Sequence, residues 1–511
     1  MRFIRSHWLA AISTALLALV CGNAQATQPR YGGTLHVKLR SAGVSLDPRE
    51  WKPGSLAVAD SEKLASLVYD RLVTLDDYGK FQPALAIEWS HDASGKNWQF
   101  KLRSGVHFSD GSALTPAGGA AALQATLGRG FEVGAAENGI SIRASRPIPD
   151  LLEQLASSRN FVFRVLPDGT LLGTGPFFVA ESLAAAPSEV NPTAIKAARI
   201  KFQANENCWA GRPFVDYVEV VLGEPSLRQL LDLQVGKADI AEIAPDLVRK
   251  ARQEGLRIWS SAPRTLVALR FDDALTAPAA DQLREALWLA LDCETMANVL
   301  LQREAQPASA LLPQWLSGYA FLFESPMNLQ RARELQAGFP AGVAGVNQPL
   351  RLRLDAPGDL FKLMGERVAV NTRQANLLVQ VALPGSANTS SPVTAGLRLF
   401  AWHYDSLSPH AELETFIKQV MQGGDLPVNS TDPEFLFAQE RRLVEERHIL
   451  PLVSLPESVG VRGTVHNWNP SAWGDWRLAD VWLESEETAP AKAASGGQKD
   501  SSTLRNPGAR P

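Results

Sequence analysis

Hydrophobic and polar residues follow two different periods along the chain, and stretches of the two kinds alternate. Residues 32–40 alternate apolar and polar side chains after two glycines, which predicts a first strand. Residues 58–72 instead place Leu64, Leu67 and Val68 on one face at the spacing of a helix. The pattern therefore predicts a strand and then a helix near the start of the folded chain.

The next stretch has the pattern of short strands separated by turns. Residues 98–102 and 106–108 are strand-like, and the Ser-Gly pair at 104–105 between them predicts a hairpin. The Asp-Gly pair at 110–111 predicts a further turn, and Thr115 before a proline predicts the start of a helix.

The middle and the end of the chain mix both periods. Strands are expected at 216–223 and 265–271, and a helix followed by a short strand is expected at 226–243. Residues 279–301 carry the longest helical pattern, and residues 434–455 predict a helix followed by a buried strand. Helices that alternate with strands in this way predict an α/β fold.

The first residues have the pattern of an export signal. Arg2 and Arg5 precede an apolar run at 8–20, and a small-x-small triplet follows at 24–26. This arrangement is typical of a secretory signal peptide. We therefore expect cleavage after Ala26 and a periplasmic protein.

Three further features concern the exported form. Cys21 raises the alternative of a lipoprotein anchor, but Val20 stands where such a site needs a small residue, so we favour the cleavable signal peptide. No later run reaches the roughly 20 apolar residues that span a bilayer. Residues 487–511 are rich in Ala, Ser, Gly, Lys and Pro, which predicts a disordered tail.

Composition narrows the range of partners. The formal net charge of −4 over 511 residues argues against a nucleic-acid partner, because proteins that bind phosphate usually carry a basic excess. The 13 Trp residues suit either a core or a binding cleft. Cys208 and Cys293 remain after cleavage, and we expect two buried free thiols rather than a disulfide.

The sequence lacks the common catalytic motifs. It contains no nucleophile elbow, no zinc-protease motif and no phosphate-binding loop. Of the eight histidines, only His403 and His410 are close together, and their spacing is not typical of a metal site. We therefore expect no enzyme activity, no metal and no cofactor.

The segment WHYDSLSP, residues 402–409, places one carboxylate among aromatic residues. A turn explains it, because Asp, Ser and Pro are common turn residues. A ligand pocket explains it too, with aromatic walls and with Asp405 to hold a cation. The segment alone leaves both interpretations open.

Several segments form an ordered series of short motifs. Four of them lie at 173–177 (GTGPF), 205–220, 233–240 and 283–296. The densest set precedes these, within 67–115, and consists of Tyr69, Leu72, Pro83, Leu85, Ala86, Trp89, Phe100, Leu102, Arg103, Gly105, Val106, Phe108, Asp110, Gly111, Leu114 and Thr115. In residues and in order, these motifs resemble the family 5 extracellular solute-binding proteins of ABC importers, the dipeptide, oligopeptide and nickel group.

The resemblance implies an α/β periplasmic binding protein with two hinge-linked lobes, an extra inserted subdomain and a ligand between the lobes. Gly173 and Gly175 are expected to permit a tight turn. The implied boundaries are a signal peptide at 1–26, lobe I at 27–57, 170–264 and 463–486, its inserted subdomain at 58–169, lobe II at 265–462 and the tail at 487–511.

The resemblance also implies a role for the segment 402–409. Peptide binders of this family carry a W-x-x-D-x-x-[DE]-P pattern whose Asp pairs with the free α-amino group of the peptide. Trp402, Asp405 and Pro409 keep that spacing, whereas Ser408 stands where an acidic residue is usual.

The implied ligand-binding residues are four neighbours in this segment. Asp405 is the expected amine anchor and Trp402 the expected pocket wall, with Tyr404 and His403 as further candidates. A buried ammonium group needs a charged acceptor, so the assignment of Asp405 also agrees with general physical chemistry.

The resemblance implies an exported component of an ABC importer that captures short peptides and delivers them to a membrane permease, without catalysis. We expect a monomer whose partners are a peptide, or a similar amine-bearing ligand, and the permease complex. Two alternatives remain open. The same fold could bind a nickel chelate, haem, an opine or an oligosaccharide, or the protein could be an exported hydrolase or a non-transport sensor.

Overall fold

The predicted signal peptide at 1–26 and the predicted tail at 487–511 lie outside the described residues. Residues Pro29–Leu483 form one compact unit. The computed structural model describes residues 28–484 except for 129, 184–198, 277, 320–322, 324–326, 341, 344, 356–357, 383–395, 423–425 and 427–430.

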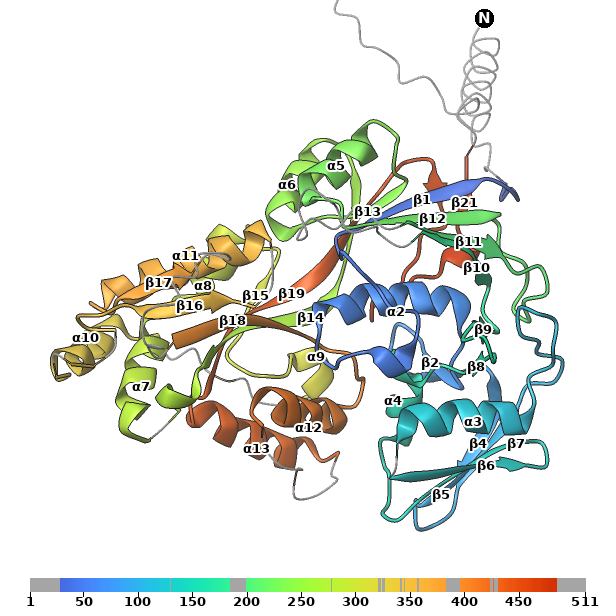
Figure 1. The fold of residues 1–511 in the computed structure, drawn as a ribbon, viewed down its shortest axis with the longest axis horizontal. Helices are drawn as coiled ribbons and strands as arrows, with labels where there is room; N and C mark the ends of the chain where they lie inside the picture. The colour runs from blue at the N-terminus through green and yellow to red at the C-terminus, as the bar shows by residue number, and fades with distance from the viewer. Residues whose placement is uncertain are drawn as a thin grey trace, which may run out of the picture. The chain divides into compact units, whose positions relative to one another are not determined.

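A large mixed sheet of eleven strands organises this unit (Figure 1). Its strands follow the order β10 (Phe177–Leu183), β11 (Arg199–Ala204), β12 (Tyr217–Leu222), β1 (Thr34–Leu39), β13 (Ile240–Glu242), β19 (Ile449–Val461), β14 (Arg257–Phe271), β18 (Gly396–His403), β16 (Leu350–Leu354) and β17 (Val379–Ala382), and β15 (Gln306–Pro307) pairs with β19. β1 and β16 each pair in parallel with both neighbours, and the other described pairs of this sheet are antiparallel.

Two long strands connect the two halves of this sheet. The first half consists of β10, β11, β12, β1 and β13, and the second half consists of β18, β16 and β17. β14 and β19 run between them, and their register shifts between Ser260 and Thr265, around the paired Pro263 and Pro456. Because proline has no N–H to donate, Pro263 and Pro456 donate no ladder hydrogen bonds at this crossing.

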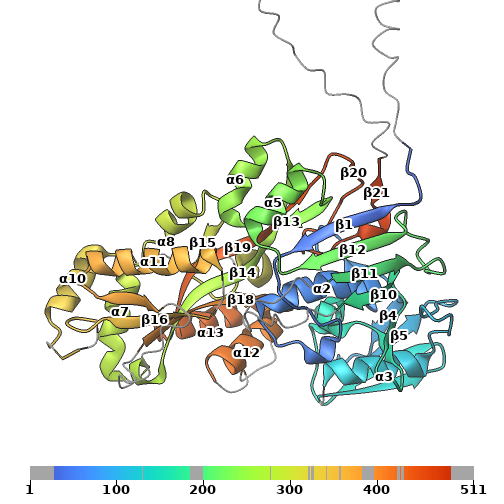
Figure 2. The ribbon, with the colours of Figure 1, turned by 45° about the horizontal axis from the view of Figure 1, so that its top comes forward.

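Helices cover both faces of the first half (Figure 2). α2 (Leu56–Val68) packs on the face that includes Ile240, whereas α5 (Ser226–Gln234) and α6 (Pro245–Gln253) pack on the face that includes Ala241. Neighbouring residues of one strand point to opposite faces, so β13 contributes to both cores.

The second half is covered in the same way. Val267 of β14 faces a core that also contains α7 (Asp281–Ala290) and α11 (Asp359–Gln374). Leu266 faces a core formed with α12 (Pro409–Val420) and α13 (Pro433–Glu445). This alternation explains why residues 266–269 form a continuous apolar run: the strand is buried on both faces there.

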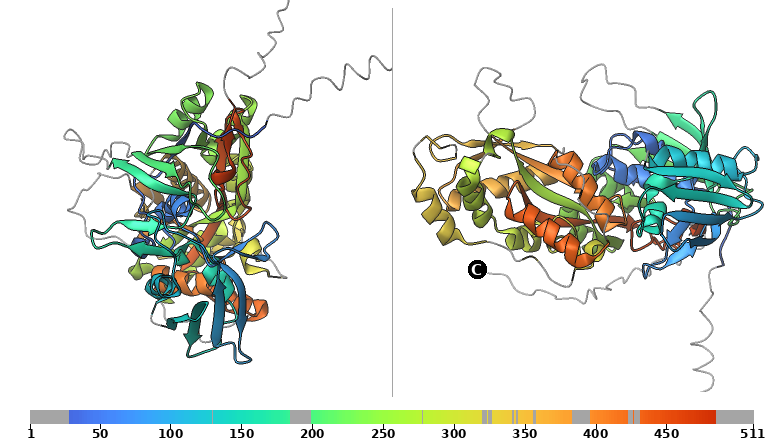
Figure 3. Two further views of the ribbon diagram at one scale, coloured as in Figure 1. Left: turned by 90° about the vertical axis from the view of Figure 1, so that its right-hand side faces the viewer. Right: turned by 90° about the horizontal axis from the view of Figure 1, so that it is seen from below.

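A second, smaller sheet has its own core. Figures 1 and 3 show α3 (Pro116–Leu127) lying along this sheet, and α4 (Leu151–Ala156) closes the same core. Its strands follow the order β4 (Ala86–His91), β5 (Asn97–Leu102), β7 (Gly139–Ala144) and β6 (Phe131–Ala136).

Most of the predicted elements are present. The first strand and helix correspond to β1 and α2, the elements of 226–243 to α5 and β13, and the predicted helix and buried strand of 434–455 to α13 and β19. Thr115 caps α3, because its side chain accepts a hydrogen bond from the N–H of Gly118.

The predicted hairpin at 98–108 is wrong. β5 pairs with β4 on one side and with β7 on the other, so residues 106–108 have no free edge of β5 to join. They make only an isolated bridge between His107 and Ala113, around the turn predicted at 110–111.

The long helix predicted at 279–301 is also wrong as a single element. α7 ends at Ala290, and the side chain of Asp292 accepts a hydrogen bond from the N–H of Thr295, which starts a new helical turn. A short π-helical turn, Met296–Leu300, follows. An Asp inside an apolar helical pattern has thus acted as a cap and interrupted the helix.

Gly173 and Gly175 serve packing rather than a turn. A Cβ atom at Gly173 would lie 1.8 Å from the carbonyl oxygen of Val68, and one at Gly175 would lie 2.8 Å from the same oxygen. The residues therefore allow the GTGPF segment to approach the end of α2, which corrects the expectation of a tight turn.

Candidate functional site

The segment 402–409 links the end of β18 to the start of α12. Ser408 is the N-cap of α12, and its hydroxyl accepts a hydrogen bond from the N–H of Ala411 at 3.1 Å. The same hydroxyl donates to the carboxylate of Asp150, which lies before α4. Ser and Asp are both favourable N-caps, so Ser408 preserves this local function of the segment.

Asp405 is the one acidic residue of segment 402–409, and it is buried and already paired. Its carboxylate forms an ion pair with the guanidinium of Arg159, which lies 246 residues earlier in the chain. Burial raises the pKa of Asp405, the charge of Arg159 opposes this rise, and the charge of Glu62 adds to it. The site therefore stabilises a cation next to Asp405.

His403 lies in the interior with its ring between two charged groups. Its Nε2 atom lies 3.3 Å from a carboxylate oxygen of Glu62 and 3.4 Å from the guanidinium of Arg264. Burial, followed by the charge of Arg264, lowers the pKa of His403 to about 3. The ring is therefore neutral at physiological pH. Its backbone N–H donates to the carbonyl of Gly54 at 2.9 Å.

Trp402 belongs to the hydrophobic core of the second half. Its ring packs edge-on against Phe416 and its Nε1–H donates to the carboxylate of Glu412 at 2.6 Å. The indole ring also lies against Gly54, because a Cβ atom at position 54 would be 2.1 Å from it. Gly54 thus packs directly on Trp402.

Tyr404 is fixed at both ends. Its hydroxyl donates to the carbonyl of Leu311 at 2.6 Å, and its own carbonyl accepts a hydrogen bond from the guanidinium of Arg264 at 2.8 Å. Burial, and then the charge of Glu412, raises the pKa of its hydroxyl well above the ordinary value. Tyr404 therefore holds the backbone next to Asp405 in place.

Glu412 supports the turn from below. One of its oxygens accepts from Trp402 and the other accepts from the N–H of Ser406 at 2.9 Å. Burial, and then the charge of Asp405, raises the pKa of Glu412 to about 8. Glu412 is therefore mostly protonated at neutral pH and adds little negative charge near Asp405.

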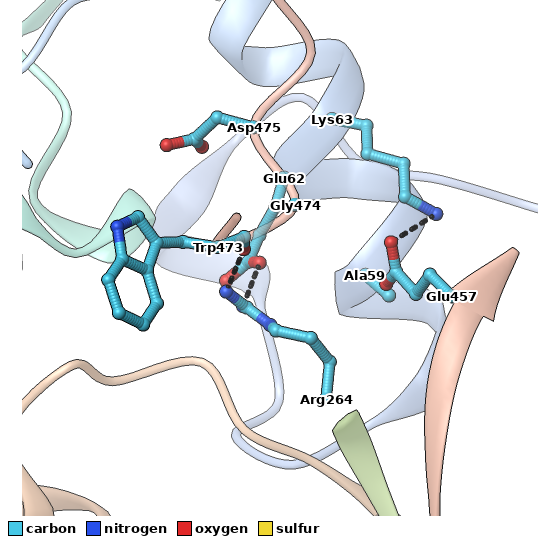
Figure 4. Close-up of a pocket in the computed structure, with 8 residues that line it drawn as sticks. All are labelled: Ala59, Glu62, Lys63, Arg264, Glu457, Trp473, Gly474 and Asp475. Atoms are coloured by element: carbon cyan, nitrogen blue, oxygen red, sulfur yellow. Dashed lines mark hydrogen bonds and ion pairs between the residues drawn. The ribbon is translucent and has the colours of Figure 1, made fainter. Parts of the chain in front are cut away.

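A network of buried charges adjoins this segment, and Figure 4 shows part of it around a cavity of about 10 Å³, which has room for about one water molecule. Arg264 points toward Glu62 at 3.2 Å, and Lys63 points toward Glu457 at 3.2 Å. Burial raises the pKa of Glu62 to about 7, and Arg264 opposes this rise.

A larger cavity of about 500 Å³ lies on the second half, and its lining includes Pro313, Tyr319 and Phe323. The carboxylate of Glu440 organises its wall, because it accepts hydrogen bonds from the backbone of Leu311 and Leu312 and from the hydroxyl of Tyr319. Its volume lies in the range of small-molecule pockets. Its lining includes none of the four predicted site residues.

Three further observations concern the described residues as a whole. Cys208 and Cys293 are free and buried, as expected. Across the described ranges, no group of three or more His, Cys, Asp or Glu side chains could hold a metal ion. Within the same ranges, none of the helices has the length and apolar character needed to span a bilayer.

Residues 80–423 match the family model described as bacterial extracellular solute-binding proteins, family 5 Middle. The match covers more than half of the 511 residues. The chain belongs to this family. The resemblance identified from the motifs is therefore confirmed, and the family consists of solute-binding proteins.

Individual relatives are distant. The chain is 25% identical over 365 residues to a probable di/tripeptide-binding protein of Pseudomonas aeruginosa strain UCBPP-PA14, covering 65% of this chain and 68% of that protein. It is 26% identical over 367 residues to the nickel-binding periplasmic protein of Escherichia coli K12, covering 64% of this chain and 67% of that protein.

Solved structures share the fold. An ABC transporter substrate-binding protein from Listeria monocytogenes superposes with a TM-score of 0.71 at 14% identity, over 89% of this chain and 100% of that chain. The predicted fold class, a two-lobed α/β binding protein, is thereby confirmed.

Several residues of the site were not predicted from the sequence, among them Arg159, Gly54 and Glu62. Arg159 follows two serines in a short helical turn, Gly54 follows a proline, and Glu62 lies on the predicted helix. The local pattern around each is ordinary. Only the fold brings Arg159 to Asp405, Gly54 to Trp402 and Glu62 to His403.

Proposed function

We propose that this protein is the exported, periplasmic substrate-binding component of an ABC importer and that it binds short peptides by their free amino end. In this proposal Asp405 accepts the ligand's α-ammonium group, and the loaded monomer delivers the ligand to a membrane permease without catalysing a reaction. The observation that carries the proposal is the burial of the Asp405 carboxylate beside a cation.

The physical support comes from the cost of burying a charge. The side chain of Asp405 is only 4% exposed, so an ionised carboxylate there requires a positive partner. An ammonium group can fill that role through a charge-assisted hydrogen bond. A neutral ligand supplies no positive charge, so the site should select ligands that carry an ammonium group.

The neighbours of Asp405 would serve as its frame. Tyr404 is held through Leu311 and Arg264, and the N–H of Ser406 is held by Glu412, so the carboxylate is placed by fixed backbone on both sides. Trp402 as a pocket wall and His403 as a contact remain predictions, and in this structure both side chains are buried.

The name of the Pseudomonas relative, a di/tripeptide-binding protein, supports a peptide ligand. The second candidate is a nickel chelate, favoured by the Escherichia relative, which is named as a nickel-binding protein. Because no metal-binding group of side chains occurs in the described ranges, a nickel ion would have to arrive with most of its own donor atoms.

The test combines native mass spectrometry of freshly purified protein with thermal shifts against pooled di- and tripeptides and their N-acetylated forms. A bound ligand raises the melting temperature of the native state. We expect free-amine peptides to do so and acetylated ones to fail. A co-purified nickel complex, with no shift by any peptide, would favour the second candidate instead.

The matched variants are Asp405→Asn and Asp110→Asn. Asp405→Asn should lower the affinity for free-amine peptides about 30-fold or more, which is the usual loss when one partner of a buried charge pair is removed. Asp110 also pairs with an arginine, Arg164, but lies at the surface, and its variant should bind as the wild type does. Unchanged affinity in Asp405→Asn would remove Asp405 from the proposal.

A further inference from the structure

In this structure the chain's own groups occupy the contacts that a peptide's amino end would use. The guanidinium of Arg159 pairs with Asp405, and the carbonyl of Gly54 accepts the backbone N–H of His403. A bound peptide's backbone could accept the same N–H in place of Gly54. The face of Trp402 is covered by Gly54 as well.

Arg159 differs from Asp405 in its exposure to water. Its side chain is 31% exposed, whereas that of Asp405 is 4% exposed. The backbone around it is held, because Ser158 accepts a hydrogen bond from Arg71 and the side chain of Asn160 donates to the carbonyl of Gln154. The guanidinium can therefore turn toward water while its short helix stays in place.

The charge balance at Asp405 makes this movement an exchange of cations. Glu62 adds negative charge near the buried Asp405 carboxylate, so an ionised Asp405 needs a positive group beside it. When a ligand's ammonium group binds Asp405, Arg159 is no longer needed to neutralise that carboxylate. Water can then solvate the Arg159 guanidinium, because its side chain is 31% exposed. A ligand without a cation would leave the buried Asp405 carboxylate without a positive partner and would not displace Arg159.

We infer that Arg159 is a specificity-determining residue that competes with the ligand's ammonium group for Asp405. This inference rests on the proposed function. The competition reduces the affinity for every ligand by the fraction of molecules in which Arg159 is turned away. It also excludes neutral ligands, because only a second cation can replace the first without leaving Asp405 unpaired.

The experiment measures the affinity of the tripeptide Ala-Ala-Ala by isothermal titration calorimetry, with acetyl-Ala-Ala-Ala as the neutral comparison. Arg159→Gln removes the competing charge and should tighten binding of the free tripeptide by about tenfold. Arg159→Lys keeps a positive charge and should bind within about twofold of the wild type. Arg164→Gln breaks another arginine–aspartate ion pair, the one with Asp110, which lies at the surface, and should have no effect on binding.

Equal or weaker binding of Ala-Ala-Ala by Arg159→Gln would overturn the competition. If Arg159→Gln does not fold, nitrogen-15 spectra of the wild type decide the question, with the Nε–H signal of Arg159 assigned through Arg159→Lys. That signal should shift on titration with Ala-Ala-Ala if Arg159 leaves Asp405. A signal that stays constant at saturation would overturn the inference.

The two proposals fail in different ways. If the wild type binds Ala-Ala-Ala, Asp405→Asn does not, and Arg159→Gln equals the wild type, the anchor stands and the competitor is wrong. If Asp405→Asn binds as tightly as the wild type, the anchor itself is wrong and the competitor falls with it.

Discussion

Gly54 packs so closely on the indole ring of Trp402 that a Cβ atom at position 54 would lie 2.1 Å from the ring. The backbone of Gly54 is left-handed, with φ of 71°, and its carbonyl accepts the N–H of His403. Two features, the space beside Trp402 and the backbone conformation, therefore require glycine here.

The first prediction separates these two requirements. Gly54→Ala should lower the free energy of unfolding by about 2–4 kcal/mol, since it combines left-handed strain with a clash against a buried ring. Gly105→Ala is the matched control, because φ is 73° there and no atom lies within 4 Å of the added Cβ. It should lose only about 1 kcal/mol. Equal losses in urea unfolding would show that the contact with Trp402 is absent in solution.

The second prediction concerns the buried ammonium of Lys63, which lies 2.9 Å from Asp60, 2.7 Å from Glu242 and 3.2 Å from Glu457. Lys63→Met would leave two buried carboxylates, Asp60 and Glu242, and the partly buried Glu457 without their shared cation. It should cost about 3–5 kcal/mol of unfolding free energy, the usual penalty for removing one partner of a buried ion pair.

Lys101→Met is the control for that variant. Lys101 pairs with Glu88 at 3.2 Å, but both side chains are more than half exposed, so its removal should leave the melting temperature unchanged. Denaturant unfolding of the two variants side by side checks the difference. A stable Lys63→Met protein would mean that the carboxylates take up protons at little cost.

The third prediction concerns pH and His403, whose pKa burial, followed by Arg264, lowers to about 3. Unfolding returns this pKa to about 6.5, so between pH 6.5 and 3 the unfolded chain binds more protons than the folded one. The folded state therefore loses stability as the pH falls through this range. His403→Gln should remove that loss, and its stability relative to the wild type should rise by about 2 kcal/mol from pH 6.5 to pH 5.

Chemical unfolding of both proteins at several pH values measures this difference. Glu62 titrates near the same ring, with its pKa raised to about 7 by burial, but it is present in both proteins. His91→Gln provides the control, since His91 is exposed. A difference between His403→Gln and the wild type that does not change with pH would contradict the prediction.

The sequence correctly predicted the elements whose pattern lies within a few neighbouring residues. β1, α2 and β12 were predicted because alternation and helical spacing are properties of neighbouring residues. The failures arose where a distant strand or a single side chain decided the outcome. β4 and β7 took both edges of β5, and Asp292 broke an apolar helical run.

The candidate site shows the same division. The sequence singled out Asp405 because an isolated carboxylate among aromatic residues is unusual and because its spacing matched a family pattern. It could not show Arg159, which reaches Asp405 across 246 residues of chain through the packing of the small sheet's core. A side chain's partner is a property of the fold, and no period or spacing encodes it.

The two crossing strands also say something about the ancestry of the chain. Thr265 stands opposite Leu455 in the ladder of β14 and β19, so the polypeptide enters and leaves the second half at adjacent points. A segment with adjoining ends can be inserted into a host, or removed from it, with little disturbance of either. The second half therefore has the chain layout of an inserted domain, which recombination could exchange as a single segment between distant relatives.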